Sequence, residues 1–190
     1  MVMTLHDLTH VHYPQTQPRD RLAEIERRVG KGVERSRCVL TDSQHVAEEI
    51  RRHFALPADR VTVAPLGCAP RFHPRSAEAI AAPLQPLELV PGQYLICVGT
   101  LEPRKNLTLA LKAYALLPER VRAHLPLVIV GMPGWRDETL NETLRKAVAS
   151  GQVRLLGYQS DESLARLLAG ARALLFPSLY EGFGLPVLEA

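Results

Sequence analysis

The sequence predicts an α/β fold made of two units, each with a parallel β-sheet. Short apolar runs that are typical of buried strands alternate along the chain with segments whose apolar residues recur at helical spacing. A proline-rich segment, residues 68–92, separates one such series from a second. Because parallel strands need a crossover connection, usually a helix, this alternation favours parallel sheets on both sides of the interruption.

The first unit is expected over residues 1–67. Its predicted strands are 2–5, 37–41 and 61–64, and its predicted helices are 19–35 and one that follows Asp42 and Ser43. Apolar residues at every third or fourth position of 19–35 indicate a helix with one buried face. Ser43 is a suitable helix N-cap, because its hydroxyl can accept a hydrogen bond from a free backbone N–H.

Residues 68–92 are interpreted as a linker, because prolines recur there without a sustained apolar period. The second unit is expected over residues 93–190. Its predicted strands are 94–98, 125–130, 153–156 and 173–176, and its predicted helices are 105–117, 140–148 and one capped by Ser160. A last helix is expected to begin near Pro186 and to be cut by the end of the chain at Ala190.

The composition is that of an ordinary globular protein, with 46% hydrophobic and 23% charged residues among 190. A net charge of +3 fits small anionic ligands or an anionic surface, but is too small to argue for nucleic acid. No apolar run approaches the ~20 residues that span a bilayer, and the N-terminus lacks a signal-peptide pattern. Three widely spaced cysteines are expected to be reduced thiols of a cytoplasmic protein.

The most informative segment is residues 176–190, which read FPSLYEGFGLPVLEA and follow the apolar run 173–176. A strand, a turn with two glycines and a helix start follow one another there. Glycines let the backbone approach a ligand closely, and the first N–H groups of a helix have no partner within it. Glu181 and Glu189 flank these donors. Carboxylates that accept hydroxyl protons, beside amides that donate to hydroxyl oxygens, favour a polyhydroxylated ligand.

This segment resembles the motif of the retaining glycosyltransferases of family 4, which have the two-domain GT-B architecture. Residues 39–43 (VLTDS) and 61–67 (VTVAPLG) resemble the end of the family's acceptor-side domain, and residues 98–106 (VGTLEPRKN) resemble the opening of its donor-binding domain. The resemblance covers nearly the whole chain. It also implies that both domains are incomplete, so that these 190 residues alone are expected to be inactive.

Residues 98–106 follow a strand and open a helix, which is where ligands bind in open α/β sheets. The segment has neither the P-loop nor the dinucleotide-binding glycine pattern. By resemblance, Gly99, Arg104 and Lys105 bind the donor diphosphate. Many relatives have an additional arginine directly after the glycine, where this chain has Thr100. Lys105 is therefore expected to be the main phosphate contact, ahead of Arg104.

The resemblance also assigns the other site residues. Glu181, with Gly182, Phe183 and Gly184, would contact the donor sugar, and Glu189 would contact the ribose. His6 would face the sugar from the other domain, where it could pair with Asp7. Catalytic roles are expected for Glu181, His6 and Lys105. A glycosidase with paired carboxylates at the anomeric carbon is disfavoured, because here the carboxylates would lie along a nucleotide sugar.

No metal or other cofactor is expected. His6, His10 and His12 lie close together in sequence, but no carboxylate or cysteine accompanies them at a spacing diagnostic of a metal site. The alternative for His6 is a structural histidine at a strand end. Tyr158 could lie near the nucleotide base or pack in the fold, and this is left open.

The sequence therefore predicts a retaining hexosyltransferase of polysaccharide or glycolipid assembly. The expected donor is GDP-mannose, and the expected acceptor is a saccharide or a lipid-linked saccharide. The alternatives are a UDP-hexose donor, or a non-catalytic module that binds a nucleotide or sugar. The segment Arg19–Arg37 has seven basic and four acidic residues. It could contact the inner membrane surface, although mixed charges favour an ordinary solvated face.

Overall fold

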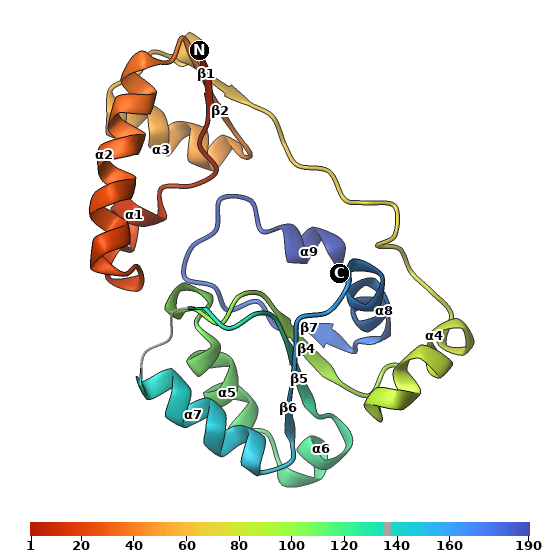
Figure 1. The fold of residues 1–190 in the computed structure, drawn as a ribbon. Coiled ribbons are helices and arrows are strands. Elements are labelled where there is room, and N and C mark those ends of the chain that lie inside the picture. Colours follow the sequence, from red (N-terminus) through yellow and green to blue (C-terminus); the bar gives the residue numbers. More distant parts are fainter. Residues whose placement is uncertain (135–137) are drawn as a thin grey trace. The chain divides into compact units, whose positions relative to one another are not determined.

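Two parallel β-sheets organise the chain in the computed structural model, which describes residues 1–134 and 138–190 (Figure 1). The chain divides into two compact units. Unit 1 is Met1–Gly67 with Tyr180–Leu185, and unit 2 is Cys68–Leu179 with Pro186–Ala190. The predicted α/β class with parallel sheets is confirmed. The segment Tyr180–Leu185 is unexpected, because it packs with unit 1 although its sequence neighbours belong to unit 2.

Unit 1 has a three-stranded parallel sheet in the order β1-β2-β3. Its elements are β1 (Val2–Thr4), α1 (Thr9–His12), α2 (Arg19–Arg35), β2 (Cys38–Thr41), α3 (Gln44–Phe54) and β3 (Val61–Val63). Val33 of α2 and Ile50 of α3 pack with Val39 of β2 in the core of this unit. Ser43 caps α3 as predicted, because its Oγ accepts a hydrogen bond from the backbone N–H of Val46 at 3.2 Å.

Unit 2 has a four-stranded parallel sheet in the order β6-β5-β4-β7. Its strands are β4 (Leu95–Val98), β5 (Leu127–Val130), β6 (Val153–Gly157) and β7 (Ala173–Leu174). Its helices are α4 (Ala77–Leu84), α5 (Leu107–Ala115), α6 (Glu119–His124), α7 (Glu138–Ala149) and α8 (Asp161–Gly170), and α9 (Leu185–Glu189) extends from unit 1 into unit 2. Within the described residues, no helix is long and apolar enough to cross a membrane.

The sheet of unit 2 is buried on both faces. Along β4, Leu95 and Cys97 belong to the core that includes Leu111 of α5, whereas Ile96 belongs to the core that includes Leu167 of α8. Alternate side chains of a strand point to opposite faces, so the apolar run of β4 supplies both cores. This explains why the strand is apolar throughout rather than alternating.

Residues 68–92, whose composition predicts a linker, contain the helix α4. Ile80 and Leu84 of this helix are each 1% exposed and lie in the core that also contains Leu167 of α8. The helix was not predicted because proline disfavours helix interiors, and Pro83 lies inside this helix while Pro86 lies in the turn that follows it. Two further short helices, α1 and α6, were likewise not predicted.

Candidate functional site

The strand order of unit 2 places a crevice at one defined point of its sheet. From β4 the chain adds β5 and then β6 on one side, and β7 returns to pair with β4 on the other side. Ligands of open α/β sheets bind at such a reversal, outside the carboxyl ends of the strands. The carboxyl ends of β4 and β7 lead into residues 98–106 and 175–178, so two of the predicted binding segments meet here.

Lys105 and Gly99 lie together in this crevice. The crevice is small, ≈ 10 Å³, and its lining includes Val98, Gly99, Lys105, Phe176, Pro177 and Ser178. Gly99 has φ +143°, and a Cβ there would lie 3.3 Å from Cε of Lys105. The Lys105 ammonium lies 5.9 Å from the centre of the Phe176 ring, within the range of a cation–π interaction. The structure therefore brings the main predicted phosphate contact to the switch point of the sheet.

The turn that presents Lys105 is fixed by bonds to the segment after β7. Asn106, with φ 53°, separates a 3₁₀ turn (Pro103–Lys105) from α5, and its side-chain amide donates to the carbonyl of Pro177 at 3.1 Å. The backbone N–H of Leu179 donates to the carbonyl of Arg104 at 2.9 Å. Asparagine tolerates the left-handed conformation better than most residues. The position of Lys105 therefore depends on contacts with residues some seventy positions away.

Gly131 supports the same edge of the sheet and was not singled out from the sequence. A Cβ at this position would lie 1.9 Å from the carbonyl oxygen of Gly99. No side chain fits there without displacing the end of β4. The sequence signal was present, because Gly131 directly follows β5 as Gly99 follows β4.

Arg104 has a structural partner. Its guanidinium forms an ion pair with Glu102 at 2.7 Å, and Glu102 is only 4% exposed. The buried carboxylate requires a nearby cation, because an unpaired charge is costly in the interior. This contact gives Arg104 a structural role that sequence reasoning missed.

Glu189 lies apart from Lys105 within unit 2. It lines a separate cavity with Phe72, His73 and residues of α8. Burial raises the pKa of its carboxyl, and the nearby charge of Asp161 raises it further. The cavity around Glu189 and the crevice around Lys105 have no lining residue in common.

The remaining predicted residues belong to unit 1. Glu181, Gly182, Phe183 and Gly184 are part of the segment that packs there, and Glu181 is partly exposed. The Tyr180 hydroxyl accepts from the backbone N–H of Leu8 at 3.2 Å and donates to Glu49 at 2.5 Å. Burial and the neighbouring Glu49 raise the Tyr180 pKa, so this hydroxyl stays protonated. These two hydrogen bonds hold the side chain of Tyr180, the residue directly before Glu181, in place.

Gly182 is equally constrained. The Ser43 hydroxyl donates to its carbonyl at 2.6 Å. A Cβ on Gly182 would lie 2.0 Å from the carbonyl oxygen of His6, so a side chain would push the segment away from unit 1. Gly182 was expected to lack a side chain so that a ligand could approach. In the structure, the missing side chain also leaves room for the backbone at His6.

His6 pairs with Asp42 and not with Asp7 as the sequence suggested. Its Nδ1 lies 2.7 Å from Oδ2 of Asp42, whose side chain is 7% exposed, while the His6 side chain is 68% exposed. Asp7 instead accepts from the backbone N–H of Thr9 at 2.8 Å, at the start of α1. A buried carboxylate on Nδ1 orients the ring and leaves Nε2 for another partner. Among the described residues, no group of three or more metal-ligating side chains could bind a metal.

Two family models match the chain. Residues 86–190 match the model "Glycosyl transferases group 1", and residues 1–72 match the model "Glycosyltransferase Family 4". Among curated proteins, O-antigen chain mannosyltransferase B of Escherichia coli is 39% identical over 189 residues, which are 100% of this chain and 50% of that protein. Serotype-specific mannosyltransferase WbdA of Escherichia coli is 32% identical over 163 residues, 83% of this chain and 20% of that protein.

Solved structures show the same fold. Anabaena HepE in complex with UDP and glucose has a TM-score of 0.78 at 18% identity, with 100% of this chain and 49% of that chain covered. WaaG, described as a glycosyltransferase involved in lipopolysaccharide biosynthesis, has a TM-score of 0.75 at 21% identity, with 100% and 53% covered. This likeness confirms the GT-B-like prediction. The chain spans about half the length of these proteins, and a smaller share of WbdA.

Proposed function

Because the chain belongs to the group 1 glycosyl transferases, we propose that the whole protein transfers a hexose from a nucleotide diphosphate sugar to a saccharide or lipid-linked saccharide. The proposed sugar is mannose, and the proposed donor is GDP-mannose. Both matched Escherichia coli relatives are named as mannosyltransferases, and one of them as an O-antigen chain enzyme, which supports a place in polysaccharide assembly. A UDP-hexose remains the alternative donor.

The observation that carries this proposal is the position of Lys105 in the crevice between the ends of β4 and β7. A helix N-terminus such as that of α5 attracts an anion by ~0.3–1 kcal/mol at an exposed site. A hydrogen bond from a charged donor contributes roughly 1.5–3 kcal/mol, so Lys105 is expected to dominate diphosphate binding. Its charge also stabilises the negative charge that develops on the diphosphate as the bond to the sugar breaks.

The residues of unit 1 are assigned to the sugar. Glu181 accepts hydrogen bonds from donor hydroxyls, with backbone N–H groups of Phe183 and Gly184 as further contacts. His6, oriented by Asp42, presents Nε2 to a sugar hydroxyl. Glu189 is assigned to the ribose. Transfer proceeds with retention, because the departing phosphate takes the acceptor proton on the same face, and no protein nucleophile or metal is required.

We also propose a cytoplasmic location for the whole protein, because its proposed donor is a nucleotide sugar, which is a substrate of the cytoplasm. The helix α2 is assigned to solvent rather than to a membrane surface. Its four acidic residues offset part of the charge of its six basic ones, and Glu24 forms ion pairs with both Arg27 and Arg28. Co-sedimentation with anionic vesicles tests this assignment, and salt-sensitive binding that is lost on substitution of Arg27 and Arg28 would contradict it.

Transfer assays on the whole protein test the function. GDP-mannose and UDP-glucose are supplied in parallel with a mannose-containing oligosaccharide, and the anomeric configuration of the product is determined by NMR. Transfer from GDP-mannose with retention is expected. Glu181→Gln keeps the shape of the side chain and removes its charge, so turnover should fall more than affinity for GDP. Binding of nucleotides without any transfer would support the non-catalytic alternative instead.

A further inference from the structure

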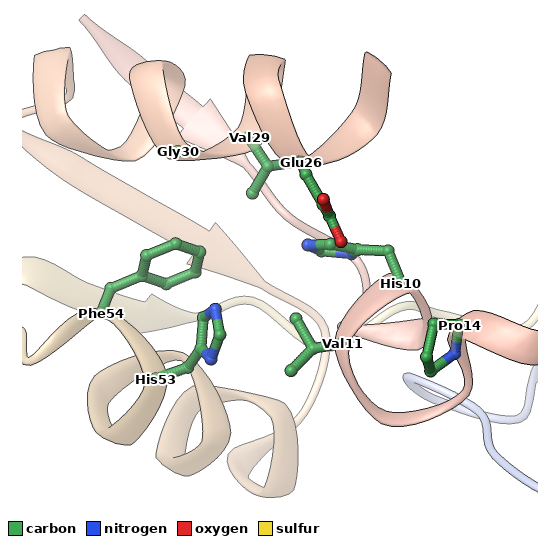
Figure 2. A pocket seen from close by; sticks show the side chains of 8 residues that line it. All are labelled: His10, Val11, Pro14, Glu26, Val29, Gly30, His53 and Phe54. Carbon is green, nitrogen blue, oxygen red and sulfur yellow. The ribbon is translucent and has the colours of Figure 1, made fainter. Parts of the chain in front are cut away.

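Unit 1 contains a cavity that the proposed function does not use. It has a volume of ≈ 330 Å³ and lies among α1, α2 and α3 (Figure 2). Its lining residues are His10, Val11, Pro14, Glu26, Val29, Gly30, His53 and Phe54. Small-molecule sites begin at about 300 Å³, so this volume suits a ligand of the size of one sugar residue.

Among the polar side chains that line this cavity, His10 is buried, whereas Glu26 and His53 are exposed. His10 is 7% exposed, and within the described residues neither its ring nor the carboxylate of Glu26 makes a hydrogen bond or ion pair. Figure 2 shows the Glu26 carboxylate beside the His10 ring, with His53 on the opposite side of the space. The His10 ring and the Glu26 carboxylate are therefore available to form hydrogen bonds with a ligand or with water in the cavity.

The lining restricts the chemistry of a ligand. Burial lowers the pKa of His10, although Asp7 and Glu26 raise it in part, so its ring is neutral at pH 7 and both donates and accepts. The Glu26 carboxylate only accepts and repels anions. Val11, Val29 and Phe54 provide apolar contact. Among the described residues, no cluster that could bind a metal includes these side chains. A neutral molecule with hydroxyls and an apolar C–H face matches this lining best.

We propose that this cavity binds one sugar residue of the saccharide acceptor, as a subsite separate from His6 and Asp42. The inference rests on the proposed function only in identifying the saccharide as an acceptor. The segment that carries His6 continues directly into α1, which supplies His10 and Val11 to the cavity. Both features therefore belong to one short stretch of unit 1.

Gly30 allows a selective test. It lines the cavity, and a Cβ added there meets no atom within 4 Å. Gly30→Leu should fill the cavity without a clash, and it removes a helix-interior glycine that is unfavourable by about 1 kcal/mol relative to alanine. Gly30→Ala is the matched control, because it brings the same helix effect with little filling. Both variants should unfold at or above the parent's temperature, which separates lost binding from lost structure.

Binding of methyl α-mannoside to the whole protein is measured by NMR titration without donor. The parent and Gly30→Ala should bind it with millimolar affinity and shift the His10 ring signals, and Gly30→Leu should bind at least roughly tenfold more weakly. Absence of binding to the parent, or equal binding to Gly30→Leu, would overturn the subsite. Equal binding by a His10→Leu variant that remains folded would overturn it as well.

A transfer assay separates this inference from the proposed function. Gly30→Leu should raise the KM for the saccharide acceptor and leave donor hydrolysis by water unchanged. If the parent binds the sugar, Gly30→Leu abolishes this binding, and the protein transfers no sugar, the result would support the subsite and contradict the proposed enzymatic function. If Gly30→Leu transfers sugar normally with an unchanged KM for the acceptor, the result would contradict the subsite and support the proposed enzymatic function.

Discussion

At the scale of single residues, the buried carboxylate of Glu102 distinguishes two adjacent basic side chains. Arg104 pairs with Glu102 at 2.7 Å, whereas the Lys105 ammonium lies over the Phe176 ring. Arg104→Ala should lower the free energy of unfolding by roughly 3–5 kcal/mol, because it leaves a buried charge without its partner. Lys105→Ala should lower it by less, because Lys105 is only partly buried and its removal does not take Arg104 away from the buried carboxylate of Glu102. Urea unfolding of both variants measures the difference, and equal losses would contradict it.

His10 makes stability depend on pH. Burial lowers the pKa of its ring below the ordinary value of 6.5, so protons bind more tightly to the unfolded chain. The contribution of His10 to stability is therefore constant above the unfolded pKa. It declines as the pH falls below about 6.5 and levels off once the pH is below the folded pKa. His10→Gln should flatten this part of the stability profile, measured by urea unfolding between pH 7.5 and 5 in ~0.5-unit steps. An unchanged slope would show that other groups are responsible.

At the scale of elements, the segment Tyr180–Leu185 depends on close backbone packing. A Cβ at Gly182 would lie 2.0 Å from the His6 carbonyl oxygen, so Gly182→Ala should displace the segment from unit 1 and expose the Tyr180 ring. Gly67→Ala is the matched control, since nothing lies within 4 Å of a Cβ there. Transfer activity should fall at least roughly tenfold in the first variant and stay near the parent level in the second. Comparable activity in both would show that the packing is unimportant.

The sequence predicted elements well where local signals agreed. Ser43 and Ser160 accept from the backbone N–H groups of Val46 and Ser163, as expected of N-caps. Helix α4 was missed because tertiary contacts override its local composition: Ile80 and Leu84 are buried against α8 despite Pro83. Propensity and proline spacing contain no information about a distant helix that covers an apolar face.

At the scale of the whole molecule, the contacts of the candidate site residues depend on strand pairing that the sequence alone does not give. Gly99 and Lys105, which follow β4, share the crevice with residues 176–178, which follow β7, because β4 pairs with β7 although the two strands are far apart in the chain. The predicted pairing of His6 with Asp7 was wrong, because the actual partner is also positioned by strand pairing. Asp42 follows β2, which pairs with β1, so their carboxyl ends lie at one edge of the sheet, whereas the sequence suggested the adjacent Asp7.

Calorimetry of nucleotide binding tests the central claim, that Lys105 in the crevice of unit 2 binds the donor diphosphate. GDP and guanosine are titrated into the whole protein and into Lys105→Ala and Lys105→Arg. Only the phosphates use the charge, so Lys105→Ala should lose roughly tenfold or more in affinity for GDP and little for guanosine, with partial recovery in Lys105→Arg. An equal loss for both ligands, or no loss for GDP, would contradict the claim.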